Sequence, residues 1–296
     1  MSGLSLTHTC EVRHDPVLRA AFYALTQKVF HFSLERWHDA GFWTHDYVCH
    51  SLLDGNSMVA NASTTRMALH IEGRTLPATQ VGTVATLPEA RNRGLARRLM
   101  QEIVSEHGRE PMFLFANDSV VDFYPQFGFR RGPLETMPVF DVEPRAQRKA
   151  DADDAGEYWV RAAPTDQRVV RQVEANIVRS RRFGISSPSI AMFHLLSRFS
   201  DGVFLSPDGV FVLVGRRTGD RLDVIGLFAS EAPDPERLLS RLSLPGVRQL
   251  RFHFEPDGLG LASKRADHRL DDSHLFVNDA FPTLSGPWIF PTLAYT

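Results

Sequence analysis

The hydrophobic pattern of the first 86 residues predicts one long helix followed by short paired strands. Residues 16–31 place Leu18, Phe22, Leu25 and Val29 at the spacing of one helix face. Shorter runs of alternating apolar and polar residues follow, separated by turn residues. These runs predict two pairs of antiparallel strands, whose tight turns are Asp54-Gly55-Asn56 and Glu72-Gly73-Arg74.

The pattern changes where the last of these strands ends. Residues 87–94 have the composition of a loop, and Leu95, Leu99 and Ile103 then mark one face of a second helix. Gly108 is a suitable residue to end this helix. Beyond it, the sequence predicts a strand, a short helix and a final strand over residues 112–116, 117–126 and 127–132.

The charged stretch 143–157 has few large apolar residues, and we interpret it as a linker between domains 1–142 and 158–296. The second domain repeats the order of the first, with helices, a meander of strands, a helix and a strand. Its expected helices and strands cover residues 165–182, 188–198, 202–206, 209–217, 221–230, 234–242 and 247–254. The sequence therefore predicts an α/β chain (an α+β mixed sheet) in a tandem arrangement.

Length and composition agree with two globular domains. The chain has 296 residues, 43% of them hydrophobic and 23% charged. Its net charge is −2, carried by residues 1–145, while residues 146–296 are neutral, so neither half has the basic character of a nucleic-acid binder. No apolar run reaches the ~20 residues of a membrane helix. Without a secretory pattern, and with two cysteines in all, we expect a cytoplasmic protein.

The most informative segment is residues 81–100, where a predicted strand leads through Arg91-x-x-Gly94-x-Ala96 into a helix. The first N–H groups of a helix have no partners within it and lie at the positive end of its dipole. Gly94 and Ala96 are small, so a phosphate can approach the backbone, and further arginines add positive charge. The pattern favours a pyrophosphate site; the alternative is a basic surface turn before an ordinary helix. The segment lacks the glycine patterns of dinucleotide sites and of P-loops.

The second segment is residues 113–131. Asn117 follows a predicted strand, where its amide can bind an amide-bearing ligand. Tyr124 lies shortly before the Phe127-Gly128-Phe129 turn, and packing in the core is the alternative interpretation of this tyrosine.

Taken together, the two segments resemble the GCN5-related N-acetyltransferase (GNAT) superfamily, with its acyl-CoA acyltransferase fold. The resemblance covers the motifs at 79–131 and, by element order, residues 1–140. It implies that acetyl-CoA is the cosubstrate and that Tyr124 is the general acid. It also implies a set of cofactor-binding residues: Val84, Ala85, Thr86, Arg91, Asn92, Arg93, Gly94, Leu95, Ala96, Arg97, Asn117, Ser119 and Tyr124.

The chemistry expected of such a site needs no covalent enzyme intermediate. A neutral primary amine attacks the thioester, and the backbone N–H of Val84 stabilises the oxyanion. The hydroxyl of Tyr124, with an ordinary pKa of about 10, then protonates the departing thiolate. The sequence does not single out a base for the amine: Glu35, His45, Asp46 and water all remain open.

The acceptor is predicted to be a small-molecule or peptidyl amine, with no nucleic acid or membrane as partner. Among the aromatic residues between 30 and 47, Trp37, Trp43 and Tyr47 are the candidates for the acceptor pocket. The carboxylate of Thr296 is a further candidate, because the chain ends in the apolar FPTLAYT, and multi-domain aminoglycoside acetyltransferases place a C-terminal carboxylate in the active site.

No metal site is predicted. The cluster of His31, His38, His45, Cys49 and His50 has no spacing typical of zinc ligands.

The second domain lacks an equivalent of the Arg91–Arg97 loop, since its corresponding segment, EAPDPERLL, is acidic and contains prolines. We expect it not to bind acetyl-CoA but to shape the acceptor pocket or an oligomer interface, such as that of a homodimer. A non-catalytic acyl-CoA-binding sensor on the same fold is the alternative function. A structural interaction protein would require the loop match to be accidental.

Overall fold

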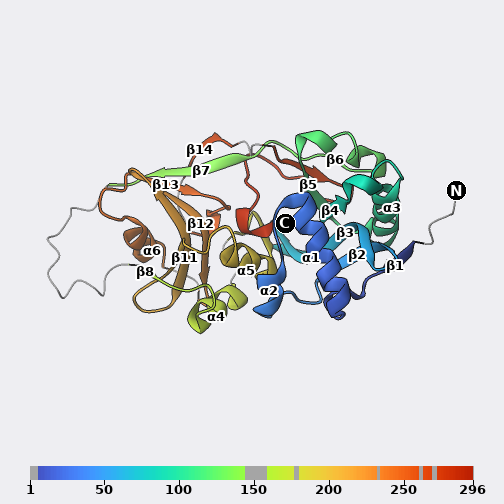
Figure 1. Ribbon diagram of the computed structural model, residues 1–296. Helices are drawn as coiled ribbons and strands as arrows, with labels where there is room; N and C mark the ends of the chain where they lie inside the picture. Colours follow the sequence, from blue (N-terminus) through green and yellow to red (C-terminus); the bar gives the residue numbers. More distant parts are fainter. Residues whose placement is uncertain are drawn as a thin grey trace.

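The chain forms two β-sheets that lie side by side (Figure 1). The computed structural model describes residues 6–143, 159–176, 180–231, 234–259, 263–268 and 272–295. The predicted linker, apart from Glu143, lies outside these residues, as does Thr296.

The first sheet has the order β1-β2-β3-β4-β5-β15-β6, and β9 pairs with a further part of β3. All neighbours in it are antiparallel except β4 and β5, which are parallel. Its strands are β1 (Thr7–Thr9), β2 (Tyr47–Asp54), β3 (Ser57–Ile71), β4 (Arg74–Thr86), β5 (Met112–Ala116), β6 (Arg130–Arg131), β9 (Phe183–Ser186) and β15 (His274–Val277).

The second sheet has the order β14-β7-β13-β12-β11-β10-β8. It too contains one parallel pair, β12 with β13, at the end of an antiparallel meander. Its strands are β7 (Thr136–Asp141), β8 (Val160–Arg161), β10 (Val203–Leu205), β11 (Phe211–Thr218), β12 (Arg221–Ala229), β13 (Gln249–Phe252) and β14 (Lys264–Asp267).

Among the helices of the described chain, α3 connects the parallel strands β4 and β5, and α6 connects β12 and β13. The α-helices are α1 (Pro16–Phe30), α2 (Glu35–Asp39), α3 (Leu95–His107), α4 (Gln167–Ala175), α5 (Pro188–Leu196) and α6 (Pro235–Leu242). The short 3-10 segments are η1 (Glu11–Arg13), η2 (Pro88–Ala90), η3 (Asp118–Val120), η4 (Tyr124–Phe127), η6 (Asp257–Leu259) and η7 (Thr292–Ala294). Local sequence explains the main starts: Asp15 caps α1 and Ser187 caps α5, each before a proline at the first turn.

Equivalent elements recur in the two halves. The series β2-β3-β4-α3-β5 has its counterpart in β10-β11-β12-α6-β13, with the helix joining the parallel pair each time. The predicted mixed α/β class is confirmed, and the two sheets fit the predicted tandem arrangement.

The two halves also exchange strands, which the sequence division at 143–157 does not anticipate. β7 precedes the predicted linker but pairs with β13 and β14 of the second sheet. β15 comes from the second half but lies between β5 and β6 of the first sheet. Each sheet is therefore completed by a strand from the other half. The largest cluster of buried apolar residues includes side chains of both sheets, such as Phe113 of β5 and Val212 of β11.

The segment after β5 also differs from its prediction. Residues 117–126 were expected to form one short helix, but they form the two 3-10 segments η3 and η4. Pro125 accounts for part of the difference, because proline has no N–H for a helical hydrogen bond. No helix in the described residues combines the length and apolar character needed to cross a membrane.

Candidate functional site

The parallel strands β4 and β5 pair only over Thr79–Val81 and Met112–Leu114 and then separate. At the point of separation, β4 carries a bulge against β3, because Asn61 pairs with Ala85 while Ser63 pairs with Gly82. Thr83, within the bulge, has a φ of 48°, which is unusual for a β-branched residue. The bulge leaves Val84 on the side of an open groove.

Buried hydrogen bonds hold the bulge in place. The side-chain amide of Asn61, which is fully buried, donates to the carbonyl of Thr83 at 2.9 Å and to Ser63 Oγ at 2.9 Å. The hydroxyls of Tyr47 and Thr83 are 2.8 Å apart. Sequence reasoning missed Asn61 and Thr83, although a lone asparagine within an apolar strand was an available signal.

The loop before α3 presents backbone donors to the same groove. Gly94 is the N-cap of α3 with a φ of 74°, and Asn92 also has a positive φ of 61°. In the described chain no hydrogen bond is made by the backbone N–H groups of residues 92–97. Such a turn at a helix start is suited to bind an anion. The exposed side chains of Arg91, Arg93 and Arg97 add positive charge beside it.

The facing wall of the groove follows β5. Asn117 Oδ1 accepts hydrogen bonds from the backbone N–H and the hydroxyl of Ser119, so its side chain caps η3. Tyr124 lines the groove but is only 5% exposed. Burial raises the pKa of Tyr124 to about 12, so its hydroxyl keeps its proton at neutral pH.

The groove has a volume of about 980 Å³, large enough for an extended cofactor. Two of the expected cofactor-binding residues do not line it: Ala85, which is buried, and Arg93, which is exposed. The other eleven do: Val84, Thr86, Arg91, Asn92, Gly94, Leu95, Ala96, Arg97, Asn117, Ser119 and Tyr124.

The aromatic residues expected in the acceptor pocket lie in the core instead. Trp37, Trp43 and Tyr47 are each 2–3% exposed, and their rings contact one another at centroid distances of 5.2–5.6 Å. The indole N–H of Trp37 donates to the carbonyl of Ser189 and that of Trp43 to the carbonyl of Tyr47. Buried tryptophan and tyrosine side chains typically find a hydrogen-bond partner within the protein for their polar atom.

A different set of aromatic residues lines the groove. Phe30 and Phe32, at the end of α1, stack at 5.8 Å, and Phe115 and Phe123 lie along the other wall. The ring of Tyr295, close to the end of the chain, lies 4.5 Å from that of Phe115. Thr296, the residue after it, lies outside the described part of the chain.

The structure does not bring an obvious base to the groove. None of the described residues that line it is Asp, Glu or His. Glu35 and His45 are exposed elsewhere, and Asp46 borders a separate cleft beside Ser186–Ser189.

The corresponding space in the second sheet is filled by the chain itself. The pairing of β12 with β13 ends at Val224 and Phe252, as that of β4 with β5 ends in the first sheet. Beyond this point, Thr292 donates its backbone N–H to the carbonyl of His253 at 3.0 Å. A Cβ on Gly226 would overlap Leu293 Cδ1, so the tail packs directly on β12.

Comparison with known families agrees with this geometry. Residues 16–132 match the family model described as "Acetyltransferase (GNAT) domain". The N-terminal half contains a GNAT domain. The match indicates acyl-CoA-dependent acetyl transfer as its general activity. No curated protein matches the chain.

Solved structures extend the likeness over both halves at the level of the fold. A GNAT protein from Kribbella flavida is 19% identical with a TM-score of 0.55, and the alignment covers 92% of this chain and 70% of that one. Eis1 from Mycobacterium abscessus is 14% identical with a TM-score of 0.56, covering 92% and 72%. A probable N-acyltransferase from Enterococcus faecalis is 12% identical with a TM-score of 0.55, covering 92% and 71%. Both halves of this chain thus lie within a fold shared with GNAT structures.

Proposed function

We propose that the chain is an acetyl-CoA-dependent N-acetyltransferase that acts on a primary amine. The observation that carries the proposal is the groove itself. It joins the unpaired backbone N–H groups of residues 92–97 to the separated strands β4 and β5, and Tyr124 lies on its wall. A pyrophosphate fits the first feature and an extended pantetheine arm fits the second.

In the proposed reaction, each wall of the groove has its own role. The amine attacks the thioester carbonyl, a C–N bond forms, and the backbone N–H of Val84 stabilises the oxyanion. The C–S bond then breaks, and Tyr124 donates its proton to the thiolate, while the proton of the amine leaves to water and the tyrosinate takes a proton back from solvent. The groove offers no ionisable base among the described lining residues, which favours water in that role.

The second half is proposed to complete the acceptor side rather than to bind a second cofactor. Residues 291–294 occupy the space between β12 and β13 that corresponds to the cofactor groove. The aromatic side chains of Phe30, Phe32 and Phe115 along the groove favour an acceptor that carries an apolar or aromatic group near its amine. A small molecule or a peptide with a free amine meets this description.

Calorimetric titration with acetyl-CoA is the direct test. We expect one equivalent per chain, with weaker binding in the Arg91→Ala and Arg97→Ala variants, whose side chains line the groove. Arg109→Ala, exposed at the far end of α3, is the matched control and should bind normally. Two equivalents would mean that the second half also binds the cofactor, and no binding by the folded chain would remove the proposal.

A panel of amines then separates the enzyme from an acyl-CoA-binding sensor. Release of free CoA thiol that depends on the amine supports transfer. Normal binding of acetyl-CoA with no amine-dependent release across small amines and peptides would favour the sensor.

A further inference from the structure

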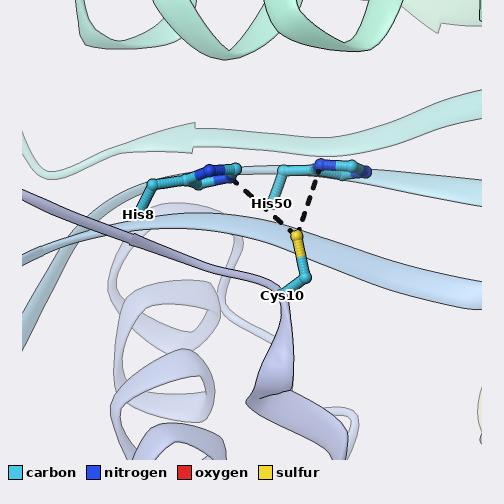
Figure 2. A group of neighbouring side chains, drawn as sticks. All are labelled: His8, Cys10 and His50. Carbon is cyan, nitrogen blue, oxygen red and sulfur yellow. Dashed lines mark hydrogen bonds between the residues drawn. The ribbon is translucent and has the colours of Figure 1, made fainter. Parts of the chain in front are cut away.

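Three side chains with metal-binding atoms meet outside the groove, on the edge of the first sheet (Figure 2). His8 belongs to β1, Cys10 directly follows that strand, and His50 belongs to β2. Their ligand atoms all lie within 4.8 Å of one another. Cys10 Sγ lies 3.7 Å from His50 Nδ1 and 4.0 Å from His8 Nε2.

Strand geometry explains why these residues meet. Residues two apart on a strand point to the same face, so His8 and Cys10 share one side of β1. β1 pairs with β2 in the register His8 with Leu52 and Thr9 with Ser51, which places His50 opposite the end of β1. Cys49, the neighbour of His50, points to the other face and contacts Ser63 instead. The histidine cluster considered from the sequence therefore does not form, but His50 joins two residues from the start of the chain.

The distances suit a tetrahedral zinc ion. With zinc–nitrogen and zinc–sulfur bonds of about 2.05 and 2.3 Å, the sulfur and nitrogen ligands of one ion lie about 3.6 Å apart. The two sulfur–nitrogen distances here are within a few tenths of an ångström of that value. A thiolate with two imidazoles is a donor set that suits zinc, whereas magnesium and calcium prefer oxygen ligands.

Both imidazoles also carry a partner on the ring nitrogen that faces away from the sulfur. His50 Nε2 lies 3.2 Å from Thr64 Oγ1, and His8 Nδ1 lies 3.6 Å from Glu102 Oε2. That carboxylate oxygen is buried and has no hydrogen-bond partner within the described chain. Histidines that bind metals characteristically donate their second N–H to such a carboxylate or hydroxyl. Metal on His8 Nε2 would fix the proton on Nδ1, where it can bond Glu102.

The charge around the site favours a cation as well. The carboxylates of Glu11, Glu102 and Glu106 all lie near enough to act electrostatically on the Cys10 thiol. Cys10 is exposed, so an ion can reach the site, and solvent can supply the remaining ligand.

We propose that His8, Cys10 and His50 bind one Zn²⁺ ion, with a water molecule as the fourth ligand. The ion would join the edge strand β1 to β2 and, through Glu102, to α3, the helix that begins at the cofactor loop. None of the three proposed ligands lines the groove, so we assign the ion a structural role. The site is independent of the proposed acyl transfer.

Cobalt substitution gives a direct test on the full, untagged and metal-free chain. Titration with Co²⁺ should saturate at one equivalent and give the intense visible bands of a tetrahedral ion with a thiolate charge-transfer band. Zn²⁺ should abolish both. Cys10→Ser should lose the charge-transfer band, and His8→Gln should bind about 10-fold or more weakly. His45→Gln, at an exposed histidine elsewhere, should match the wild type.

Thiol alkylation of the wild-type chain gives a second readout that needs no variant. Cys10 is exposed and Cys49 is buried, so the native chain should label at Cys10 alone. One equivalent of Zn²⁺ should slow this labelling at least 10-fold, whereas Mg²⁺ should not. A charge-transfer band that survives in Cys10→Ser, a weak octahedral spectrum, or labelling unaffected by Zn²⁺ would each overturn the proposal.

Discussion

His194 Nε2 lies 2.6 Å from the carbonyl oxygen of Tyr295 and so ties α5 to the tail of the chain. The ring of Tyr295 in turn packs on Phe115, which lines the groove. Burial lowers the pKa of His194 to about 4, so the imidazole is neutral at pH 7 and donates one N–H to the carbonyl. A helix of the second half therefore positions a residue beside the candidate site of the first.

Replacement of this imidazole should loosen the tail. His194→Phe keeps an aromatic ring in the cluster but removes the donor, and we expect a loss of about 1 kcal/mol in the free energy of unfolding. The amides of Thr292 and Ala294 should exchange hydrogen faster, because Thr292 donates its N–H to the carbonyl of His253 and Ala294 to that of Pro291, and both bonds depend on the position of the tail. His194→Gln, which keeps an N–H donor, should lie nearer the wild type in both measurements. Unchanged exchange in His194→Phe would show that packing alone holds the tail.

Tyr124→Phe should separate catalysis from binding. The ring remains to pack against Phe123 and Phe276, but the hydroxyl that donates the proton is lost. We expect kcat to fall about 100-fold or more, while the Kd for acetyl-CoA changes little. Rates of CoA release and calorimetric titration measure the two effects. Equal losses in kcat and affinity would contradict the role of Tyr124 as general acid.

Gly94→Ala should weaken cofactor binding beyond its effect on stability. Gly94 has a φ of 74° and its added Cβ would meet nothing within 4 Å, so backbone strain of about 1 kcal/mol is the expected cost to folding. The Cβ would also enter the space where a phosphate approaches the loop. Gly55→Ala is the matched control, with a φ of 60° and open space in a remote hairpin turn. Both variants should lose similar stability, but only Gly94→Ala should raise the Kd for acetyl-CoA.

Glu135 gives the chain a distinctive dependence of stability on pH. Burial raises the pKa of this carboxyl to about 7, although the backbone N–H of Phe290 donates to it. The folded state therefore holds a proton that the unfolded state, with a pKa near 4.5, has already released. The stability that this carboxyl contributes is complete below pH 4.5, falls as the pH rises towards 7 and is constant above that.

Glu135→Gln removes this dependence, because the amide has a similar shape and no charge. Relative to the wild type, we expect the variant to gain up to about 3 kcal/mol at pH 8 and nothing at pH 4.5. Urea unfolding at several pH values measures the difference. Glu35→Gln, at an exposed position, should follow the wild type throughout. A constant difference between Glu135→Gln and the wild type across this range would contradict a buried, protonated Glu135.

Local signals in the sequence were enough to place most of the elements. The period of the apolar residues predicted α1 and α3 nearly to the residue, with Gly108 at the end of α3, and the strand 112–116 occurs as predicted. The pattern Arg91-x-x-Gly94-x-Ala96 predicted a loop that the structure places along the groove. These features depend on neighbouring residues, which is why a single sequence reveals them.

The sequence by itself therefore determined the class of fold and the position of the Arg91–Arg97 loop before α3. Only the tertiary structure decided which aromatic residues are core, since Trp37 and Tyr47 bury their polar atoms against Ser189 and Thr83, far along the chain. It also decided the exchange of β7 and β15 between the sheets and the meeting of His8 and Cys10 with His50. Each of these contacts joins residues far apart in sequence, and strand pairing between them leaves no periodic signal in either segment alone.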